Sequence, residues 1–285
     1  MNGPEDVYLT GGTGFIGGAV AAALHRRGAS PVALSRVPGV GGQGRWVMCD
    51  LLHTVPEGAL DGCRTLVHAA SYVGDDPALQ QAVNAAGTRR LVAAAAAAGV
   101  ERIVYVSTAG VYGRAFPLGQ AERTDCQPAS PLSASRYEAE RAVLDAGGTV
   151  VRPNLVYGLG DRWFLAPLIR VMQGIGGWIG DGTARLSVIE NTTLGGAVAA
   201  LALTPHETGV YQADPRPITV RDLLSPLLDK LGVDVPGVHH DPATLAERLV
   251  SLEVAPCWCP GVRRLRWLWE RGPGRPRFSA GRDGP

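Results

Sequence analysis

Lysine is almost absent from this chain of 285 residues. Lys230 is the single lysine among 27 lysine and arginine residues, and the fourth residue before it is Pro226. The chain therefore contains no Tyr-x-x-x-Lys sequence. Arginine, which stays charged under all conditions in which proteins fold, supplies the other permanent positive charges.

Cysteine and long apolar runs are also scarce. The five cysteines are scattered, Cys257 and Cys259 are too close for an ordinary disulfide, and no zinc-ligand pattern completes them. We expect free thiols and no metal. No uncharged apolar run approaches the ~20 residues of a membrane span, and the N-terminus leads into a strand without a basic and then apolar leader. We expect a cytoplasmic protein with no membrane partner.

Net charge is small as well. A value of +1 gives no general attraction to nucleic acid or anionic lipid. The end of the chain nevertheless concentrates arginines among glycine and proline, at Arg263, Arg264, Arg266, Arg271, Arg275, Arg277 and Arg282. A nucleic-acid-binding arm is one interpretation of this segment, and a solvated tail is the one we favour. We therefore expect a small-molecule ligand and no nucleic acid.

Short β-branched runs alternate with alanine-rich stretches, the pattern of a parallel sheet with helices on both faces. The alternation predicts helices at 15–27, 82–98 and 133–145 between strands at 7–10, 31–35, 45–49, 65–69, 102–107 and 149–152. Such repeated units predict an α/β Rossmann fold with a doubly wound parallel sheet. Further along, we expect helices at 165–173, 193–203 and 220–231 and strands near 185–189 and 210–212.

The regular alternation loosens beyond Gly158, which suggests a division of the chain into three parts. We expect a dinucleotide-binding Rossmann core at 1–160 and substrate-side elements, interleaved with the core, at 161–235. The short, proline-rich remainder at 236–285 is expected to form a small lid-like segment and the basic tail.

The first expected strand runs into a glycine-rich turn that opens a helix. Gly11 permits the tight turn, Gly14 lets the backbone approach a pyrophosphate, and Gly17 lets helix and strand pack closely. The helix N-terminus then offers N–H groups and a favourable dipole to the phosphates. This segment predicts a dinucleotide site made by Thr10, Gly11, Gly12, Thr13, Gly14, Phe15, Ile16 and Gly17.

The end of the second expected strand indicates which dinucleotide binds. It reads Leu34-Ser35-Arg36, where a site for NAD usually places a carboxylate against the ribose 2′-hydroxyl. A guanidinium instead binds the 2′-phosphate of NADP with two parallel hydrogen bonds. Ser35 and Arg36 therefore predict NADPH as the cofactor in preference to NADH.

Further motifs accompany the glycine loop: Asp50-Leu51, His68-Ala69-Ala70, Asn84 with Gly87-Thr88, VYVSTAGVYG at 104–113 and RPNLVYG at 152–158. In this combination the chain, over roughly residues 6–230, resembles the extended short-chain dehydrogenase/reductases of the NAD-dependent epimerase/dehydratase type. The resemblance puts Thr108 at the family's catalytic Ser/Thr position. It also implies contacts of Asp50 and Leu51 with adenine, of Ala69 and Ala70 with ribose, and of the nicotinamide with Pro153, Asn154 and Val156.

The chain departs from the family where the catalytic Tyr-x-x-x-Lys should stand. The corresponding segment, 130–140, reads SPLSASRYEAE, with Leu132 in place of the tyrosine and Arg136 in place of the lysine. Leucine has no ionisable proton, and arginine can hold the nicotinamide ribose hydroxyls but is a poor acid. Loss of a positioned general acid costs about 10²–10⁴ in rate, whereas hydride transfer belongs to the nicotinamide itself.

The proton must then come from elsewhere. The chain resembles the atypical ketoreductases of aromatic polyketide antibiotic pathways, such as the angucyclinone ketoreductases of simocyclinone-type biosynthesis, and this resemblance implies an aromatic polyketide substrate. We interpret the protein as an NADPH-dependent ketoreductase in which a phenol of the substrate, with an acidity near that of tyrosine, supplies the proton. Internal donors are the rival explanation, with candidates Tyr72, Tyr112, Tyr137, Tyr157 and Ser133.

Two other functions are open on the sequence. A protein without the Tyr/Lys pair could be a non-catalytic NADP(H)-binding sensor that regulates a partner. The motifs at 104–113 and 152–158 argue against this, because the resemblance places both at the nicotinamide end of the site. A nucleotide-sugar epimerase or dehydratase would need the missing tyrosine for reversible proton transfer. The sequence gives no oligomeric state.

Overall fold

The chain folds into two compact units, and each is described by itself. The computed structural model describes residues 7–37, 45–113, 125–213, 217–234 and 237–241. The first unit contains Met1–Asp161 with Ser187–Arg216, and the second Arg162–Leu186 with Pro217–Pro285. The basic tail, Cys257, Cys259 and nearly all of the expected lid-like segment lie outside the described residues.

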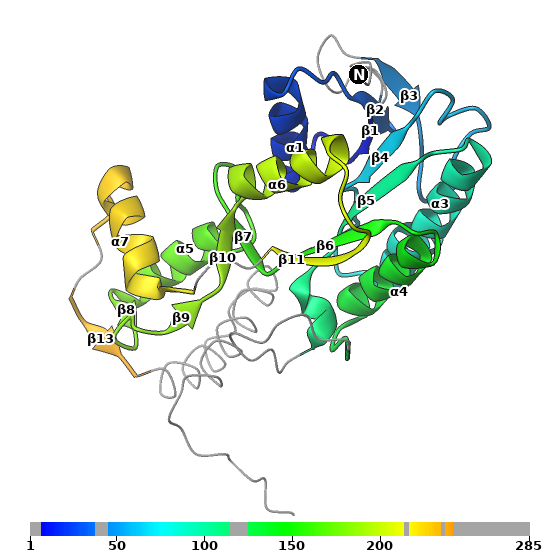
Figure 1. Ribbon diagram of the computed structural model, residues 1–285. Helices are drawn as coiled ribbons and strands as arrows, with labels where there is room; N and C mark the ends of the chain where they lie inside the picture. Colours follow the sequence, from blue (N-terminus) through cyan, green and yellow to red (C-terminus); the bar gives the residue numbers. More distant parts are fainter. Residues whose placement is uncertain (1–6, 38–44, 114–124, 214–216, 235–236, 242–285) are drawn as a thin grey trace, which may run out of the picture. The chain divides into compact units, whose positions relative to one another are not determined.

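A seven-stranded parallel sheet forms the centre of the first unit (Figure 1). Its strand order is β11-β6-β5-β4-β1-β2-β3, and every neighbouring pair is parallel. The strands are β1 (Val7–Thr10), β2 (Val32–Ser35), β3 (Trp46–Met48), β4 (Thr65–His68), β5 (Arg102–Val106), β6 (Thr149–Pro153) and β11 (Gly209–Ala213). The predicted doubly wound α/β fold is confirmed, and the winding direction reverses between β1 and β4.

Helices cover both faces of this sheet, because alternate strand residues point to opposite sides. On one face, α1 (Phe15–Arg26) and α6 (Asn191–Leu203) pack on a core that includes Val7, Leu9, Val67 and Val104. On the other, α3 (Thr88–Ala97) and α4 (Pro131–Asp145) pack on a core that includes Tyr8, Leu66, Tyr105 and Val150. Burial of these apolar side chains is the main stabilising term of such a fold.

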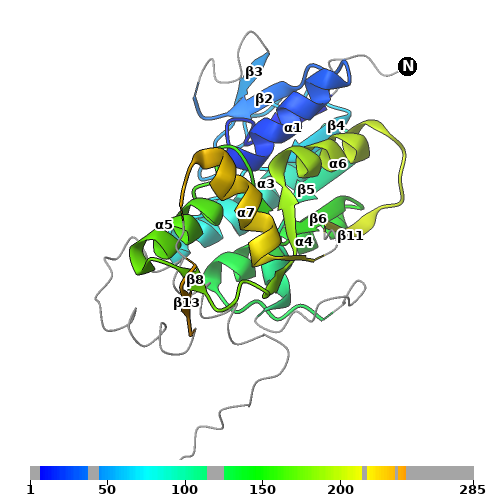
Figure 2. The ribbon, with the colours of Figure 1, turned by 90° about the vertical axis from the view of Figure 1, so that its left-hand side faces the viewer.

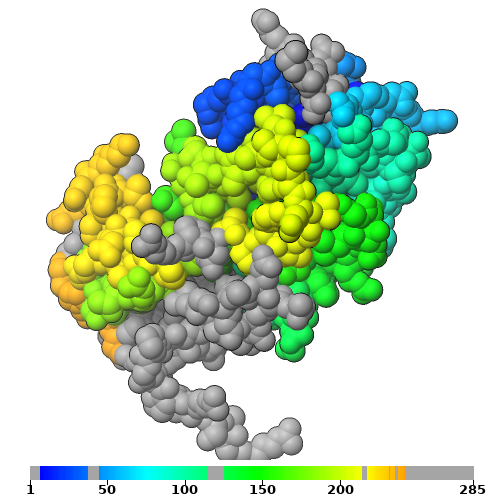
Figure 3. Space-filling model, in the orientation of Figure 1, coloured from blue at the N-terminus to red at the C-terminus, as the bar shows by residue number. Residues whose placement is uncertain are grey.

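Small residues let α1 and α6 pack closely. A Cβ added at Gly195 would lie 2.6 Å from the backbone of Ala19, so a larger residue would push the two helices apart. The helices lie side by side in Figures 1 and 2, and the surface of α1 (blue) adjoins that of α6 (yellow-green) in Figure 3. This packing fixes α1, the helix that the glycine loop opens.

The expected helix at 82–98 is observed in three parts. It begins earlier, at α2 (Pro77–Leu79), where Asp76 caps it, and continues as the π-helix η1 (Gln80–Gly87) before α3. The wide turns of η1 pass close to Leu51, since a Cβ at Gly87 would lie 2.5 Å from the Leu51 carbonyl oxygen. A π-helix shifts the periodicity of the side chains, which is why the helical pattern in the sequence does not reveal its start.

The expected strand near 185–189 is divided between the two units. In the first unit, β10 (Val188–Glu190) pairs in parallel with β7 (Leu155–Tyr157). In the second unit, β9 (Arg185–Leu186) pairs in antiparallel fashion with β12 (Ile218–Thr219). The second unit also contains α5 (Leu165–Ile175), α7 (Val220–Leu231), and β8 (Trp178–Ile179) paired with β13 (His239–His240). No helix in the described ranges combines the length and the apolar character that a bilayer crossing needs.

Candidate dinucleotide site

The glycine loop has a conformation that only glycine fits at two positions. Gly11 has φ +71°, and a Cβ there would lie 2.7 Å from the Ala70 nitrogen. A Cβ at Gly17 would lie 2.0 Å from the Gly11 carbonyl oxygen. The loop therefore lies directly against the end of β4 and against the first turn of α1. No side chain caps α1 at Gly14, so its N-terminus offers backbone N–H groups to an anion.

A cavity of about 380 Å³ opens beside this loop, at the edge where the strand order reverses. The structure brings most of the predicted cofactor residues together around it: Thr10, Gly11, Gly12, Thr13, Gly14, Ser35, Arg36, Asp50, Leu51, Ala69 and Ala70. Phe15, Ile16 and Gly17 continue from the loop into α1. The cavity lies at the carboxyl ends of β1, β2 and β4, where open α/β sheets bind their ligands.

Tyr72 and Val83 also line the cavity, and the sequence analysis did not predict them as cofactor residues. Tyr72 is held by Asn84, whose side chain accepts from the Tyr72 nitrogen at 2.7 Å and donates to its carbonyl oxygen at 3.0 Å. Asn84 also accepts from the Ser71 hydroxyl and donates to Ser135 of α4. The position of Asn84, after the His68-Ala69-Ala70 motif, is the signal from which this contact could have been inferred.

Asp50, for which the resemblance implies a contact with adenine, is a carboxylate held in place at the wall of the cavity. Its oxygens accept hydrogen bonds from the Leu52 nitrogen at 2.9 Å and from His53 Nδ1 at 2.8 Å. The His53 hydrogen bond is the largest cause that lowers the pKa of Asp50, and Leu52 and Arg36 lower it further. Arg36 is exposed at the end of β2, where nothing buries its charge. One positively charged and one negatively charged side chain, Arg36 and Asp50, therefore line the same cavity.

His68 is a neutral structural residue. Its Nδ1 lies 2.7 Å from Thr10 Oγ1 and its Nε2 2.8 Å from Thr88 Oγ1. Burial, with a smaller effect of the Arg136 charge, lowers the pKa of His68 to about 3. Thr10 Oγ1 accepts from the nitrogens of Ala69 and Ala70, so its own hydrogen is directed to His68 Nδ1. The neutral imidazole thus fixes the contact between the ends of β1 and β4.

The predicted catalytic positions lie on α4 and at the end of β5. Leu132 and Arg136 are one turn apart on α4, which begins at Pro131 after a capping box between Ser130 and Ser133. Arg136 Nη2 donates to the carbonyl oxygens of Val106 and Ser107, each at 2.9 Å. The guanidinium thus ties α4 to the strand end that precedes Thr108, a contact that the sequence analysis did not predict.

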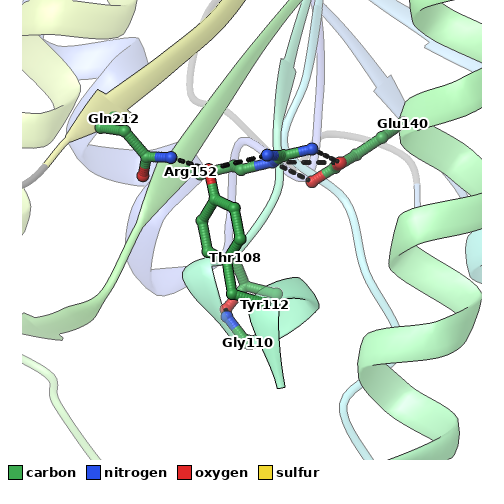
Figure 4. Close-up of polar contacts among 6 residues, drawn as sticks. All are labelled: Thr108, Gly110, Tyr112, Glu140, Arg152 and Gln212. Carbon is green, nitrogen blue, oxygen red and sulfur yellow. Dashed lines mark hydrogen bonds and ion pairs between the residues drawn. The ribbon is translucent and has the colours of Figure 1, made fainter. Parts of the chain in front are cut away.

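Thr108 caps a short 3-10 turn, η2 (Ala109–Tyr112), as Figure 4 shows. Its Oγ1 accepts from the Gly110 nitrogen at 3.1 Å, which leaves its hydroxyl hydrogen to donate elsewhere. Pro153 ends β6, Asn154 follows it, and Val156 lies on β7. These residues stand at the carboxyl ends of β5 and β6, but they do not line the 380 Å³ cavity.

A buried ion pair lies beside the Tyr112 hydroxyl at the end of η2 (Figure 4). Arg152 of β6 and Glu140 of α4 are 4% and 0% exposed. Arg152 Nε lies 3.1 Å from each Glu140 carboxylate oxygen, and Nη2 lies 2.5 Å from Oε2. Arg152 Nη1 donates to the Tyr112 hydroxyl at 2.8 Å. Removal of one partner from such a pair leaves a buried charge and costs about 3–5 kcal/mol.

The candidate internal proton donors named from the sequence differ in whether they line the cavity. Tyr72 lines the cavity. Ser133 is held in the capping box of α4, and Tyr137 packs with Tyr112 and Val111. Burial raises the pKa of Tyr112 and of Tyr157, which makes each phenol a weaker acid than usual.

Comparisons with known proteins agree with this geometry. Residues 7–186 match the NAD dependent epimerase/dehydratase family. A 4-hydroxy-2-methyl-3-oxo-4-farnesyl-3,4-dihydroquinoline-1-oxide ketoreductase of Stigmatella aurantiaca is 30% identical over 246 residues, which cover 79% of this chain and 73% of that protein. The 2-alkyl-3-oxoalkanoate reductase of Stenotrophomonas maltophilia is 30% identical over 256 residues, 79% of this chain and 76% of that one.

A solved structure of MoeE5 in complex with UDP-glucuronic acid and NAD has a TM-score of 0.67 and 27% identity, covering 83% of this chain and 85% of that one. A doubly wound sheet with a glycine loop at its reversal point defines a Rossmann dinucleotide-binding protein. The chain belongs to the NAD-dependent epimerase/dehydratase family, that is, to the extended short-chain dehydrogenase/reductases. Proteins of this fold take NAD(P) as their cofactor. The close backbone packing at Gly11 and Gly17, which leaves no room for a side chain, fits a loop that binds a dinucleotide.

Proposed function

We propose that the protein is an NADPH-dependent ketoreductase that reduces a carbonyl of an aromatic polyketide, of the angucyclinone class, in the cytoplasm. The observation that carries the proposal is the arrangement around Thr108. Leu132 and Arg136 occupy one face of α4, and Arg136 is hydrogen-bonded to the strand end beside Thr108. A threonine hydroxyl can hydrogen-bond a ketone oxygen there, and no tyrosine-lysine pair competes with it.

The proton is assigned to the substrate. The nicotinamide supplies hydride when bound, and a phenol beside the ketone can protonate the developing alkoxide because its acidity matches that of tyrosine. The names of the relatives support a ketone as the group that is reduced, but they do not support a particular ring system. The Stigmatella aurantiaca relative is a ketoreductase whose substrate name places a 3-oxo group beside a 4-hydroxyl group in a dihydroquinoline.

The test is NADPH oxidation by the purified protein with an angucyclinone quinone that carries a free phenol beside the ketone, and with its methyl ether. We expect turnover of the phenol and a rate about 100-fold or more lower for the ether, because the ether lacks the general acid. Equal rates would rule out a proton from the substrate. Saturable NADPH binding without oxidation of any ketone in a panel would favour a sensor instead.

Arg36 and Ser35 are proposed to select NADPH. Replacement of Arg36 by serine should weaken NADPH binding about 10–100-fold and leave NADH binding unchanged, since the guanidinium has a charge-assisted partner only in the 2′-phosphate. Isothermal titration with both dinucleotides measures the effect. The matched control is Arg89→Ser, which removes an exposed arginine of α3 that pairs with Glu138 of α4 and does not line the cavity. A uniform loss for both dinucleotides in Arg36→Ser would contradict the assignment.

A nucleotide-sugar epimerase or dehydratase is the second candidate, because MoeE5 was solved with UDP-glucuronic acid and NAD. Incubation with UDP-glucose and UDP-glucuronic acid separates the two functions. Conversion of either sugar nucleotide, with no oxidation of NADPH by the quinone, would replace the ketoreductase proposal.

A further inference from the structure

Tyr112 occupies the centre of a buried polar cluster that the proposed reaction does not use. Its hydroxyl accepts hydrogen bonds from Arg152 Nη1, at 2.8 Å, and from the side-chain amide of Gln212. The Arg152 guanidinium also lies over the Tyr112 ring, 4.8 Å from the centroid. Tyr112 itself is buried. Figure 4 shows its ring between the η2 turn and the two side chains that hold the hydroxyl.

The groups around Tyr112 come from three different elements. Arg152 lies on β6 and Gln212 on β11, next to each other in the sheet. Glu140 lies on α4, one turn after Arg136, and neutralises Arg152 through its two carboxylate oxygens. Tyr112 is held by one side chain from each of two strands, and one of these side chains, Arg152, is bound in turn to α4. A tyrosine held in this way has little freedom to rotate or shift. The cluster therefore fixes the C-terminal end of η2.

The opposite end of η2 is Thr108, only one short turn away. The Thr108 side chain caps the turn by accepting from the Gly110 nitrogen, so the direction of its hydroxyl depends on where Gly110 lies. Gly110 is exposed and has no side chain of its own to hold it. The turn that contains it is held at its far end by Tyr112.

We propose that Tyr112 is a positioning residue, which, held by Arg152 and Gln212, fixes the η2 turn and so directs the Thr108 hydroxyl to the ketone oxygen. This inference rests on the proposed function. Tyr112 gives up no proton in the reaction. Its hydroxyl acts as the acceptor of two hydrogen bonds, and burial makes the phenol a poor acid. A misplacement of Thr108 by about 1 Å is enough to lower the rate about 100-fold, even when the substrate still binds.

The experiment compares Tyr112→Phe with Tyr8→Phe. Both tyrosines are buried, and Tyr8 likewise makes a hydroxyl hydrogen bond, to the Asp61 carbonyl oxygen at 2.7 Å. Tyr8 belongs to a different apolar cluster from the residues of η2. For Tyr112→Phe we expect kcat for the quinone to fall about 10–100-fold, with KM and the NADPH dissociation constant changed less than about twofold. For Tyr8→Phe we expect kcat to stay at the wild-type value.

Amide hydrogen exchange of Gly110 in the protein without cofactor provides the second readout. We expect Tyr112→Phe to speed this exchange about tenfold, since local opening of η2 becomes easier, and Tyr8→Phe to leave it unchanged. An unchanged Gly110 exchange rate, or an equal fall of kcat in both variants, would overturn the inference. If the wild-type protein oxidises no NADPH, the proposed function fails, and the exchange rates alone decide whether Tyr112 holds the turn.

Discussion

The double variant Leu132→Tyr, Arg136→Lys should reduce ketones that carry no phenol about 10²–10⁴-fold faster than the wild-type protein. The two substitutions rebuild Tyr-x-x-x-Lys on the face of α4 that lies beside Thr108. A positioned general acid contributes about this factor. For a substrate whose own phenol supplies the proton, the new tyrosine is redundant, and we expect a change of less than about tenfold.

The matched control is Leu132→Phe, Arg136→Lys. It introduces the same ring and the same lysine but no hydroxyl, so any gain due only to packing or charge appears in both variants. Steady-state rates of NADPH oxidation with a simple aromatic ketone make the comparison. If the tyrosine and phenylalanine variants had equal rates, the assignment of residue 132 to the family's catalytic tyrosine position would be wrong.

Gly17→Ala should weaken NADPH binding by about 100-fold, equivalent to roughly 2.7 kcal/mol. The added Cβ would lie 2.0 Å from the Gly11 carbonyl oxygen and 2.6 Å from its carbon, and both atoms are backbone. The loop must therefore move away from α1, which displaces the N–H groups that face the pyrophosphate. We expect the melting temperature to fall as well, because an overpacked backbone contact destabilises the fold.

Gly18→Ala is the control for this effect, because Gly18 is the next residue of the same helix. A Cβ at Gly18 would meet the Gly12 carbonyl oxygen at 3.5 Å, an ordinary van der Waals contact. Alanine also favours a helix over glycine by about 1 kcal/mol. We expect unchanged NADPH binding and a slightly higher melting temperature. Equal loss of binding in both variants would show that the Gly17–Gly11 contact does not shape the loop.

The sequence predicts the fold, and most of the residues that line the cavity, for a physical reason. A strand, a tight glycine turn and a helix N-terminus are local features, and the chain that builds them is contiguous from Thr10 to Gly17. Ser35, Arg36, Asp50, Leu51, Ala69 and Ala70 each stand at the end of a predicted strand or directly after it, and parallel strands bring their carboxyl ends to one edge. These residues accordingly meet around the same cavity.

The contacts beyond that edge depend on side chains whose partners are distant in the sequence. Nothing in the residues around Arg136 predicts that its guanidinium would reach the carbonyl oxygens of Val106 and Ser107. The pairing of Glu140 with Arg152 likewise requires the register between α4 and β6. The π-helix η1 escapes a periodicity analysis because it shifts the helical repeat, and segment 242–285 lies outside the described residues.

The cofactor site is tested most directly by isothermal titration of the purified protein with NADPH and with NADH. We expect one NADPH to bind per chain, with NADH at least about tenfold weaker because it lacks the 2′-phosphate for which Arg36 is the proposed partner. The same titration with Gly17→Ala should give a much smaller affinity for NADPH. No heat of binding for either dinucleotide to the folded wild-type protein would contradict the assignment of the glycine loop as a dinucleotide site.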